Sequence, residues 1–234
     1  MTKRPVDDPP AFAGGSMAQS SRGRRSTDLL EVEVKFLVAA LGPIRERLNR
    51  GGADVIAPRV FERNVRFDTP DEALLRRQEL LRLRQDARVR LTFKGPAAED
   101  AISEAKVREE IELEVGDFDR MALILERLGL QPMQVYEKYR ETYRWGNIEI
   151  VLDELPYGNF VELEGSEDGL KTVAAALGLD WSRRVLANYL GLMDLCRRTF
   201  DLPFADLTFE NFETNPVDLG VLLPICEVLE EGEQ

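Results

Sequence analysis

The chain repeatedly alternates apolar with charged residues, which is the pattern of β-strands whose two faces differ. In residues 30–36, Glu31, Glu33 and Lys35 fall on one face, and apolar residues fall on the other. The same period returns in residues 81–84, 89–94, 108–115, 138–144, 148–153 and 160–164. A single charged run is typical of a solvated strand face, but its repetition along the whole chain indicates a shared charged surface.

Helical patterns lie between these strands, at residues 43–50, 118–128, 169–177 and 182–197. Glycines follow the first three, and Asp117 and Ser182 are expected N-caps. If the sheet closes, the helices can cover its apolar faces, and the charged faces then line a tunnel. We predict an α+β fold, namely a closed antiparallel β-barrel or tunnel with a charged interior and helices packed outside.

The two ends of the chain differ in composition from its middle. Residues 1–27 combine Pro, Gly, Ser and Arg without periodicity and are expected to form a disordered tail, in which Met17 is an alternative start. Residues 28–198 are expected to form one domain. Residues 199–234 form an acidic extension that is expected either to pack on the domain or to remain mobile.

Several classes of function are excluded by what the chain lacks. It has no histidine, which rules out Ser-His-Asp and Cys-His catalysis and the usual zinc sites. Its formal charge of -12 argues against a nucleic-acid surface. Its apolar runs are too short for a membrane span or a secretory signal, so we expect a cytoplasmic protein with reduced thiols at Cys196 and Cys226.

A tunnel lined by both signs of charge has a chemical consequence. Buried charges are costly unless they pair with one another or with a ligand. Carboxylates in such a tunnel would hold Mg²⁺, Mn²⁺ or Ca²⁺, and lysine and arginine would hold phosphate groups.

Glu31-Val32-Glu33-Val34-Lys35 matches the ExExK signature near the N-terminus of CYTH proteins, the superfamily named for class IV adenylyl cyclases and thiamine triphosphatases. Further matching segments follow in the family's order, at residues 82–84, 92–95, 108–112, 136–140, 152–154, 160–165 and 188–190. The chain therefore resembles this superfamily over about residues 29–195.

The resemblance implies a set of site residues. The implied ligands of Mg²⁺ or Mn²⁺ are Glu31, Glu33, Asp153, Glu162 and Glu164. The implied catalytic residues are Glu31, Glu33, Lys35, Glu110 and Glu112. The implied triphosphate contacts are Lys35, Arg82, Arg84, Lys94, Lys138 and Arg140. Arg90 and Arg108 lie on matching faces, Arg183 or Arg184 is a candidate for a further base, and Tyr189 is either a core residue or a residue of the tunnel mouth.

Three functions remain open at this point. The preferred one is metal-dependent hydrolysis of inorganic triphosphate, thiamine triphosphate or a nucleoside triphosphate. The second is a class IV adenylyl cyclase that converts ATP to cyclic AMP and pyrophosphate, and residues 152–164 look closest to that branch. The third is a non-catalytic module that binds polyphosphate or nucleotide. We expect a small-molecule triphosphate as the partner, neither nucleic acid nor membrane, and leave a homodimer open.

Overall fold

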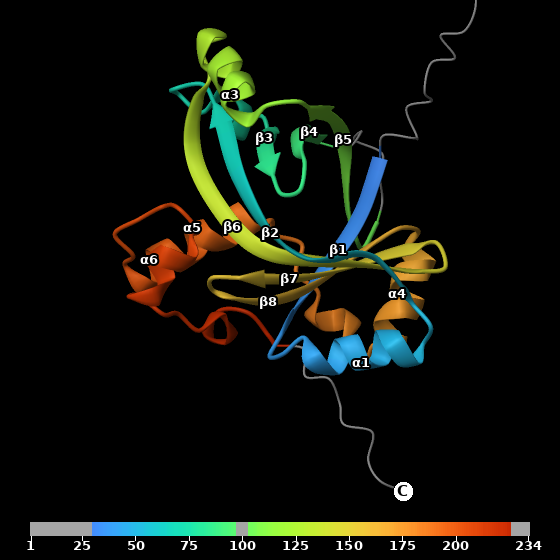
Figure 1. The fold of residues 1–234 in the computed structure, drawn as a ribbon. Helices are drawn as coiled ribbons and strands as arrows, with labels where there is room; N and C mark the ends of the chain where they lie inside the picture. Colours follow the sequence, from blue (N-terminus) through green and yellow to red (C-terminus); the bar gives the residue numbers. More distant parts are fainter. Residues whose placement is uncertain (1–29, 97–102, 226–234) are drawn as a thin grey trace, which may run out of the picture.

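The computed structural model describes residues 30–96 and 103–225 (Figure 1). Its strands close into a barrel in the order β1–β5–β4–β3–β2–β6–β7–β8, and β8 pairs again with β1. All of these pairs are antiparallel. The strands are β1 (Leu30–Val38), β2 (Asp54–Asp68), β3 (Leu80–Gln85), β4 (Val89–Pro96), β5 (Lys106–Val115), β6 (Gln131–Trp145), β7 (Ile148–Leu155) and β8 (Gly158–Glu164). The predicted α+β fold with a closed antiparallel barrel is therefore confirmed.

The register of the strands turns the charged faces inward. Lys35 on β1 pairs with Glu162 on β8, and Lys94 on β4 pairs with Glu110 on β5. Because side chains alternate along a strand, apolar neighbours such as Val34 and Phe36 point outward, where helices bury them to 1% and 0% exposure. The alternation in the sequence thus places charged side chains inside the barrel and apolar side chains outside it.

Strand β2 is absent from the strands that the sequence pattern predicts. Pro58 interrupts its first half, and register shifts against β6 occur between Val55 and Ala57 and between Ala57 and Val60. These irregularities erase the period of two that marks the other strands. In its second half, β2 places Glu62 and Asn64 in the barrel, where both are fully buried.

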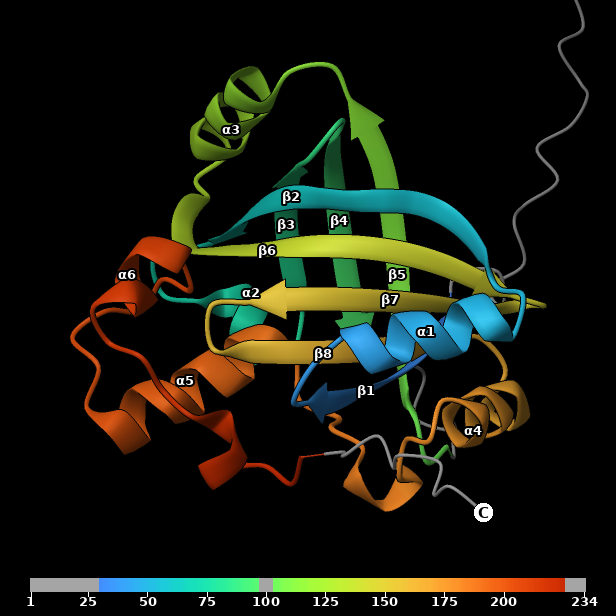
Figure 2. The same ribbon diagram turned by 60° about the horizontal axis from the view of Figure 1, so that its bottom comes forward.

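Helices cover the outside of the barrel (Figures 1 and 2). Helices α1 (Gly42–Arg50) and α4 (Glu167–Ala176) bury one apolar cluster against β1, β7 and β8. Helix α3 (Phe118–Arg127) buries another against β3 and β6, and the side chain of Asp117 accepts from Arg120 N at its start, as predicted. Helix α2 (Ala73–Arg76) is a single turn between β2 and β3.

The helix predicted at residues 182–197 is wrong in its first part. A 3₁₀ turn η2 (Trp181–Arg183) is followed by extended backbone, in which Val185 N donates to Lys35 O at 2.7 Å. Helix α5 (Tyr189–Phe200) begins only after Asn188, whose side chain accepts from Gly191 N. Asn188 therefore caps this helix, in place of Ser182.

The described part of the C-terminal extension packs against the barrel. Helix α6 (Phe209–Glu213) and turn η3 (Leu219–Val221) join α5 in an apolar cluster that contains the buried Leu207, Phe212 and Cys196. Leu207 N donates to Val135 O at 2.9 Å, and Glu137 N donates to Leu207 O at 2.8 Å. The extension thus occupies the edge of β6 that β7 does not reach.

Some expectations concern residues that lie outside the described part of the chain, namely the tail at residues 1–27 and Cys226. Among the residues that are described, no helix is long and apolar enough to cross a lipid bilayer.

Candidate active site in the charged tunnel

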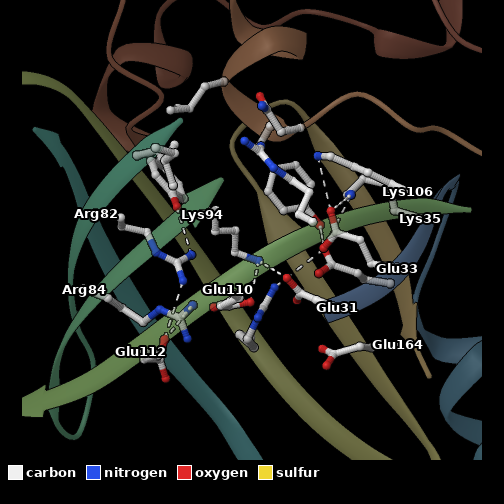
Figure 3. Close-up of a pocket in the computed structure, with 18 of the residues that line it drawn as sticks. Glu31, Glu33, Lys35, Arg82, Arg84, Lys94, Lys106, Glu110, Glu112 and Glu164 are labelled. Atoms are coloured by element: carbon white, nitrogen blue, oxygen red, sulfur yellow. Dashed lines mark hydrogen bonds and ion pairs between the residues drawn. The ribbon is translucent and has the colours of Figure 1, made fainter. Parts of the chain in front are cut away.

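A cavity of about 340 Å³ occupies the barrel, and charged side chains of both signs line it (Figure 3). The predicted site residues that line it are Glu31, Glu33, Lys35, Arg82, Arg84, Lys94, Glu110, Glu112, Lys138, Arg140, Glu162 and Glu164. Arg90 and Arg108 line it too. The structure therefore brings together in one space residues from strands that are distant in the sequence.

Carboxylates of the first strand are held by lysines. Lys94 Nζ lies 2.5 Å from Glu31 Oε2 and 2.9 Å from Glu110 Oε2, so it bridges the two acids. Glu33 Oε1 lies 3.3 Å from Lys106 Nζ and 3.4 Å from Lys35 Nζ. Figure 3 shows Glu31 and Glu33 across the cavity from Arg82 and Arg84, with Glu110 between them. The tunnel thus has an acidic side and a basic side, with lysines placed among the acids.

These surroundings set the proton affinities of the carboxyl groups. Burial, together with a hydrogen bond to Glu110, raises the pKa of Glu31 to about 9. Burial also raises the pKa of Glu164 to about 7, helped by the nearby charges of Glu149 and Glu162. Burial alone would raise the pKa of Glu33, but the charges of the neighbouring lysines outweigh it and hold that pKa well below its usual range.

Two arginines of β3 form the opposite side. Arg82 donates to Tyr136 Oη and to Thr92 Oγ1, both at 3.1 Å, while Arg84 lies 3.6 Å from Glu62 and 4.0 Å from Glu112. The buried Nε atoms of Arg82 and Arg84 have no hydrogen-bond partner among the described residues. Arg84 Nε lies 3.6 Å from Glu62 Oε1, so of these two atoms only Arg82 Nε is without a carboxylate partner among the described residues.

Asp153 is placed differently from the expectation. It is fully buried and does not belong to the lining of the cavity. Its carboxylate accepts from Lys138 at 3.0 Å and from both Nε and a terminal nitrogen of Arg140 at 2.8 and 2.6 Å. The hydroxyl of Tyr189 also contacts it, at 2.9 Å. Asp153 therefore orients two bases from behind, and its oxygens are already occupied.

Other residues of the site were not singled out from the sequence. Lys106 and Glu149 line the cavity, as do Tyr136 and Asn188, and Glu62 lies beneath Arg84 and Lys138. Lys106 shares the face of Glu110 on β5, so an earlier start of that strand would have identified it. Arg183 and Arg184, by contrast, do not line the cavity, and Arg184 pairs with Glu104 on the outside.

A divalent cation is the group that the resemblance implies, and the donors of the tunnel fit it in kind. Carboxylate oxygens are the ligands that Mg²⁺ and Mn²⁺ prefer. Burial is the main cause of the raised pKa values of Glu31 and Glu164, and a cation bound beside these carboxyl groups would lower both. Within residues 30–96 and 103–225, however, no three acidic side chains form a ready-made ligand group. Lysines stand between these acids, so their side chains must shift to admit an ion.

The amino-acid sequence was compared with protein families and with known proteins. The family model described as CYTH domain matches residues 29–179. A Methanocaldococcus jannaschii protein, provisionally named an adenylate cyclase, is 34% identical over 140 residues, which cover 59% of this chain and 78% of that protein.

Solved structures of other proteins have a similar fold. A Pyrococcus horikoshii protein is 26% identical, with a TM-score of 0.58, and the match covers 71% of this chain and 99% of that one. A Vibrio parahaemolyticus protein shares the fold with 22% identity and a TM-score of 0.62, over 68% of this chain and 95% of that one. The chain belongs to the CYTH domain family, whose enzymes act on triphosphate substrates.

Proposed function

We propose that this protein hydrolyses a triphosphate-containing substrate inside the tunnel, with Mg²⁺ or Mn²⁺ as cofactor. The observation that carries this proposal is the pair of opposed walls in one cavity. Arginines with unsatisfied N–H groups face a cluster of buried carboxylates, and the two walls suit a polyphosphate and a cation respectively.

The phosphate chain would lie against the basic wall. Arg82, Arg84, Lys138 and Arg140 provide fixed positive charge there, and Asp153 and Glu62 hold the last two in place from below. Lys35 and Lys94 complete the set from the acidic side. Preorganised cations of this kind neutralise the substrate and stabilise charge that develops on the departing phosphate.

The acidic wall would hold the metal ion and a water molecule. Glu31, Glu33, Glu162 and Glu164 would supply oxygen ligands, and a bound cation would neutralise phosphate charge. Glu110 lies between the two walls, 2.9 Å from Lys94, and Glu112 lies beside the basic wall, 3.8 Å from Arg82. We assign them to orienting the attacking water or the neighbouring bases, because among the described residues that line the tunnel the carboxylates are suited to accept a proton from water.

An adenylyl cyclase is the second candidate. The named relative from Methanocaldococcus jannaschii, 34% identical over 140 residues, favours it. In that reaction the ribose 3′-hydroxyl of ATP, rather than water, attacks the α-phosphate, and pyrophosphate leaves. The same two walls serve both reactions, and the position of the nucleophile decides between them.

A product assay separates the two candidates. The purified protein is incubated with Mg²⁺ or Mn²⁺ and, separately, with inorganic triphosphate, thiamine triphosphate and ATP, and phosphate, pyrophosphate and cyclic AMP are resolved. Phosphate release without cyclic AMP supports hydrolysis. Formation of cyclic AMP and equimolar pyrophosphate from ATP would contradict hydrolysis and support the cyclase. No turnover of any substrate would contradict both candidates.

Site variants test the two walls. We expect Glu33→Gln and Arg84→Ala each to lower turnover at least about 100-fold, because each removes a charge that the transition state uses. Glu114→Gln and Arg88→Ala are matched controls, since Glu114 on β5 pairs with Arg88 in the turn between β3 and β4, and their side chains are 60% and 61% exposed. Wild-type rates in the site variants would show that the chemistry is elsewhere.

A further inference from the structure

Thr92 is an uncharged residue on the inner face of β4, where it lies between Arg90 and Lys94 in the alternation of the strand. It is fully buried, although threonine is mostly exposed in folded proteins. Its partners on the two neighbouring strands are Arg82 on β3 and Glu112 on β5. One hydroxyl therefore stands between a base and an acid of the tunnel.

The hydroxyl of Thr92 contacts both of these neighbours. It accepts from a terminal nitrogen of Arg82 at 3.1 Å and donates to Glu112 Oε2 at 2.8 Å. An arginine side chain can only donate, so the one proton of the hydroxyl is left for the carboxylate. The two contacts are thus compatible and fix the hydroxyl in one orientation.

Glu112 is surrounded by arginines but makes no hydrogen bond to them. Its carboxylate lies 3.8 Å from Arg82, 3.8 Å from Arg90 and 4.0 Å from Arg84. These separations exceed the length of a hydrogen bond. Figure 3 shows Glu112 beside the guanidinium groups of Arg82 and Arg84. Within the described part of the chain, the contact with Thr92 is the shortest polar contact of this carboxylate.

The arginines of β3 keep their N–H groups available as a result. Arg82 uses its terminal nitrogens on two uncharged groups, the hydroxyls of Tyr136 and Thr92, both at 3.1 Å. The nearest carboxylate to Arg84 is that of Glu62, at 3.6 Å. A guanidinium that donates to a carboxylate has those N–H groups occupied and its charge compensated, and neither arginine is in that condition.

Arg140 shows what happens where no hydroxyl intervenes. Arg140 on β6 and Asp153 on β7 are direct partners, and two nitrogens of the guanidinium donate to the carboxylate at 2.8 and 2.6 Å. Lys94 and Glu110 are direct partners as well, and they lie 2.9 Å apart. A base and an acid on adjacent strands of this barrel thus close into a hydrogen-bonded pair.

We infer that Thr92 is a positioning residue, whose hydroxyl holds Glu112 out of hydrogen-bond distance of Arg82 and Arg84 and so leaves both guanidinium groups free to bind phosphate oxygens. This inference rests on the proposed function and deepens it, because it concerns how the tunnel binds a triphosphate. Without the hydroxyl, Glu112 turns onto these arginines and competes with the substrate for the same N–H groups.

A double-mutant cycle on triphosphate binding tests this inference. The protein is titrated calorimetrically with inorganic triphosphate in EDTA, which prevents metal-dependent turnover. Thr92→Val removes the hydroxyl and is expected to raise the Kd at least about 10-fold, because the freed carboxylate occupies the arginines. Thr92→Ser keeps the hydroxyl and should stay within about 2-fold of wild type. In a Glu112→Gln background, Thr92→Val should raise the Kd less than about 2-fold, because no carboxylate remains to compete.

Two further variants guard the comparison. Thr142→Val on β6 is the matched control, since Thr142 is half-buried and does not line the tunnel cavity, and it should leave the Kd unchanged. Glu112→Gln alone should bind triphosphate at least as tightly as wild type, because it removes the competing carboxylate. This second expectation holds even if Thr92→Val does not fold, which thermal unfolding determines.

Three results would overturn the inference: an unchanged Kd in Thr92→Val, an equal rise of the Kd in both backgrounds, or weaker binding by Glu112→Gln. The second of these would mean that Thr92 acts through packing alone. None of them bears on hydrolysis, which the product assay decides. No turnover in that assay contradicts the proposed function and leaves the inference standing, whereas no binding of triphosphate by the wild-type protein contradicts both.

Discussion

The hydroxyl of Tyr189 on α5 lies 2.9 Å from Oδ2 of Asp153, the carboxylate that also holds Lys138 and Arg140. The same hydroxyl lies 3.0 Å from Oε2 of Glu162, which lines the tunnel. One hydroxyl has one proton, so it can donate to only one of these carboxylates at a time. Tyr189 therefore links α5 directly to the acids beneath and beside the tunnel cavity.

Tyr189→Phe isolates the effect of this hydroxyl. The ring stays in place beneath Lys138 and Lys35, whose Nζ atoms lie 5.1 and 5.6 Å from its centroid. We expect a stability loss of about 1–2 kcal/mol in urea unfolding, together with a several-fold rise in KM, because a buried carboxylate loses its donor.

Tyr143→Phe is the matched control for that variant. The Tyr143 hydroxyl donates to Glu141 at 2.7 Å outside the tunnel, so its loss should lower stability without changing KM. A KM change of equal size in the two variants would contradict a role for Tyr189 in the site.

Asp68 is expected to stabilise the turn that carries α2, in a pH-dependent way. Burial alone would raise its pKa, but hydrogen bonds from Leu74 N, Leu75 N and Thr69 N, with the charge of Arg66, hold that pKa below its usual value. A lowered folded-state pKa adds stability above the ordinary carboxyl pKa, and this stability is lost as the pH falls through the lowered value.

Asp68→Asn should therefore cost about 2 kcal/mol at pH 6, and the difference from wild type should shrink below about pH 4. Urea unfolding at several pH values measures both effects. Asp71→Asn provides the control on the same turn, because its side chain is 66% exposed, and it should leave stability almost unchanged. A pH-independent loss in Asp68→Asn would contradict the charge-based explanation.

The C-terminal extension is expected to be necessary for a stable barrel. A chain that ends at residue 203 lacks Leu207, Phe212 and Leu219, which are 0%, 4% and 2% exposed. Burial of each such side chain contributes roughly 1.5–3 kcal/mol, and Val135 N and Glu137 N lose their partners as well.

We expect the 1–203 chain to be destabilised by several kcal/mol and to lose activity, because Tyr136 between those two residues accepts from Arg82 in the tunnel. Thermal unfolding and the product assay measure this, with a chain that ends at residue 225 as the control. Equal stability of the two truncated chains would show that the extension is dispensable.

Cys196 is expected to be unreactive in the folded protein. It is fully buried on α5, and burial raises the pKa of its thiol to about 11. In a Cys226→Ser background, we expect modification by a thiol reagent at pH 8 to be at least about 100-fold slower in buffer than in denaturing urea.

The same shift predicts a pH effect. Because the folded-state pKa lies above the ordinary thiol value, stability should fall as the pH rises from 9 toward 11, and Cys196→Ala should lack this part of the loss. Rapid modification in buffer would contradict the burial of the thiol.

The sequence by itself determined which side chains share a face. Glu31, Glu33 and Lys35 stand two residues apart, and an extended strand sends such residues to the same side whatever its neighbours are. This local geometry is why the charged interior, most strands and most of the tunnel lining could be predicted from the order of residues alone. The ordered motifs then identified the family, which the comparisons confirmed.

Only the tertiary structure decided how deeply each side chain is buried and which residues surround it. Asp153 alternates as a site residue should, yet Lys138 and Arg140 on the neighbouring strand β6 hold its carboxylate, and it does not line the cavity. Strand β2 was not predicted because register shifts break its period of two. Glu62 and Asn64, which lie on this strand, were therefore missed as well. Thr92 joins Arg82 to Glu112 across three strands, and no local pattern in the sequence encodes a contact between such distant segments.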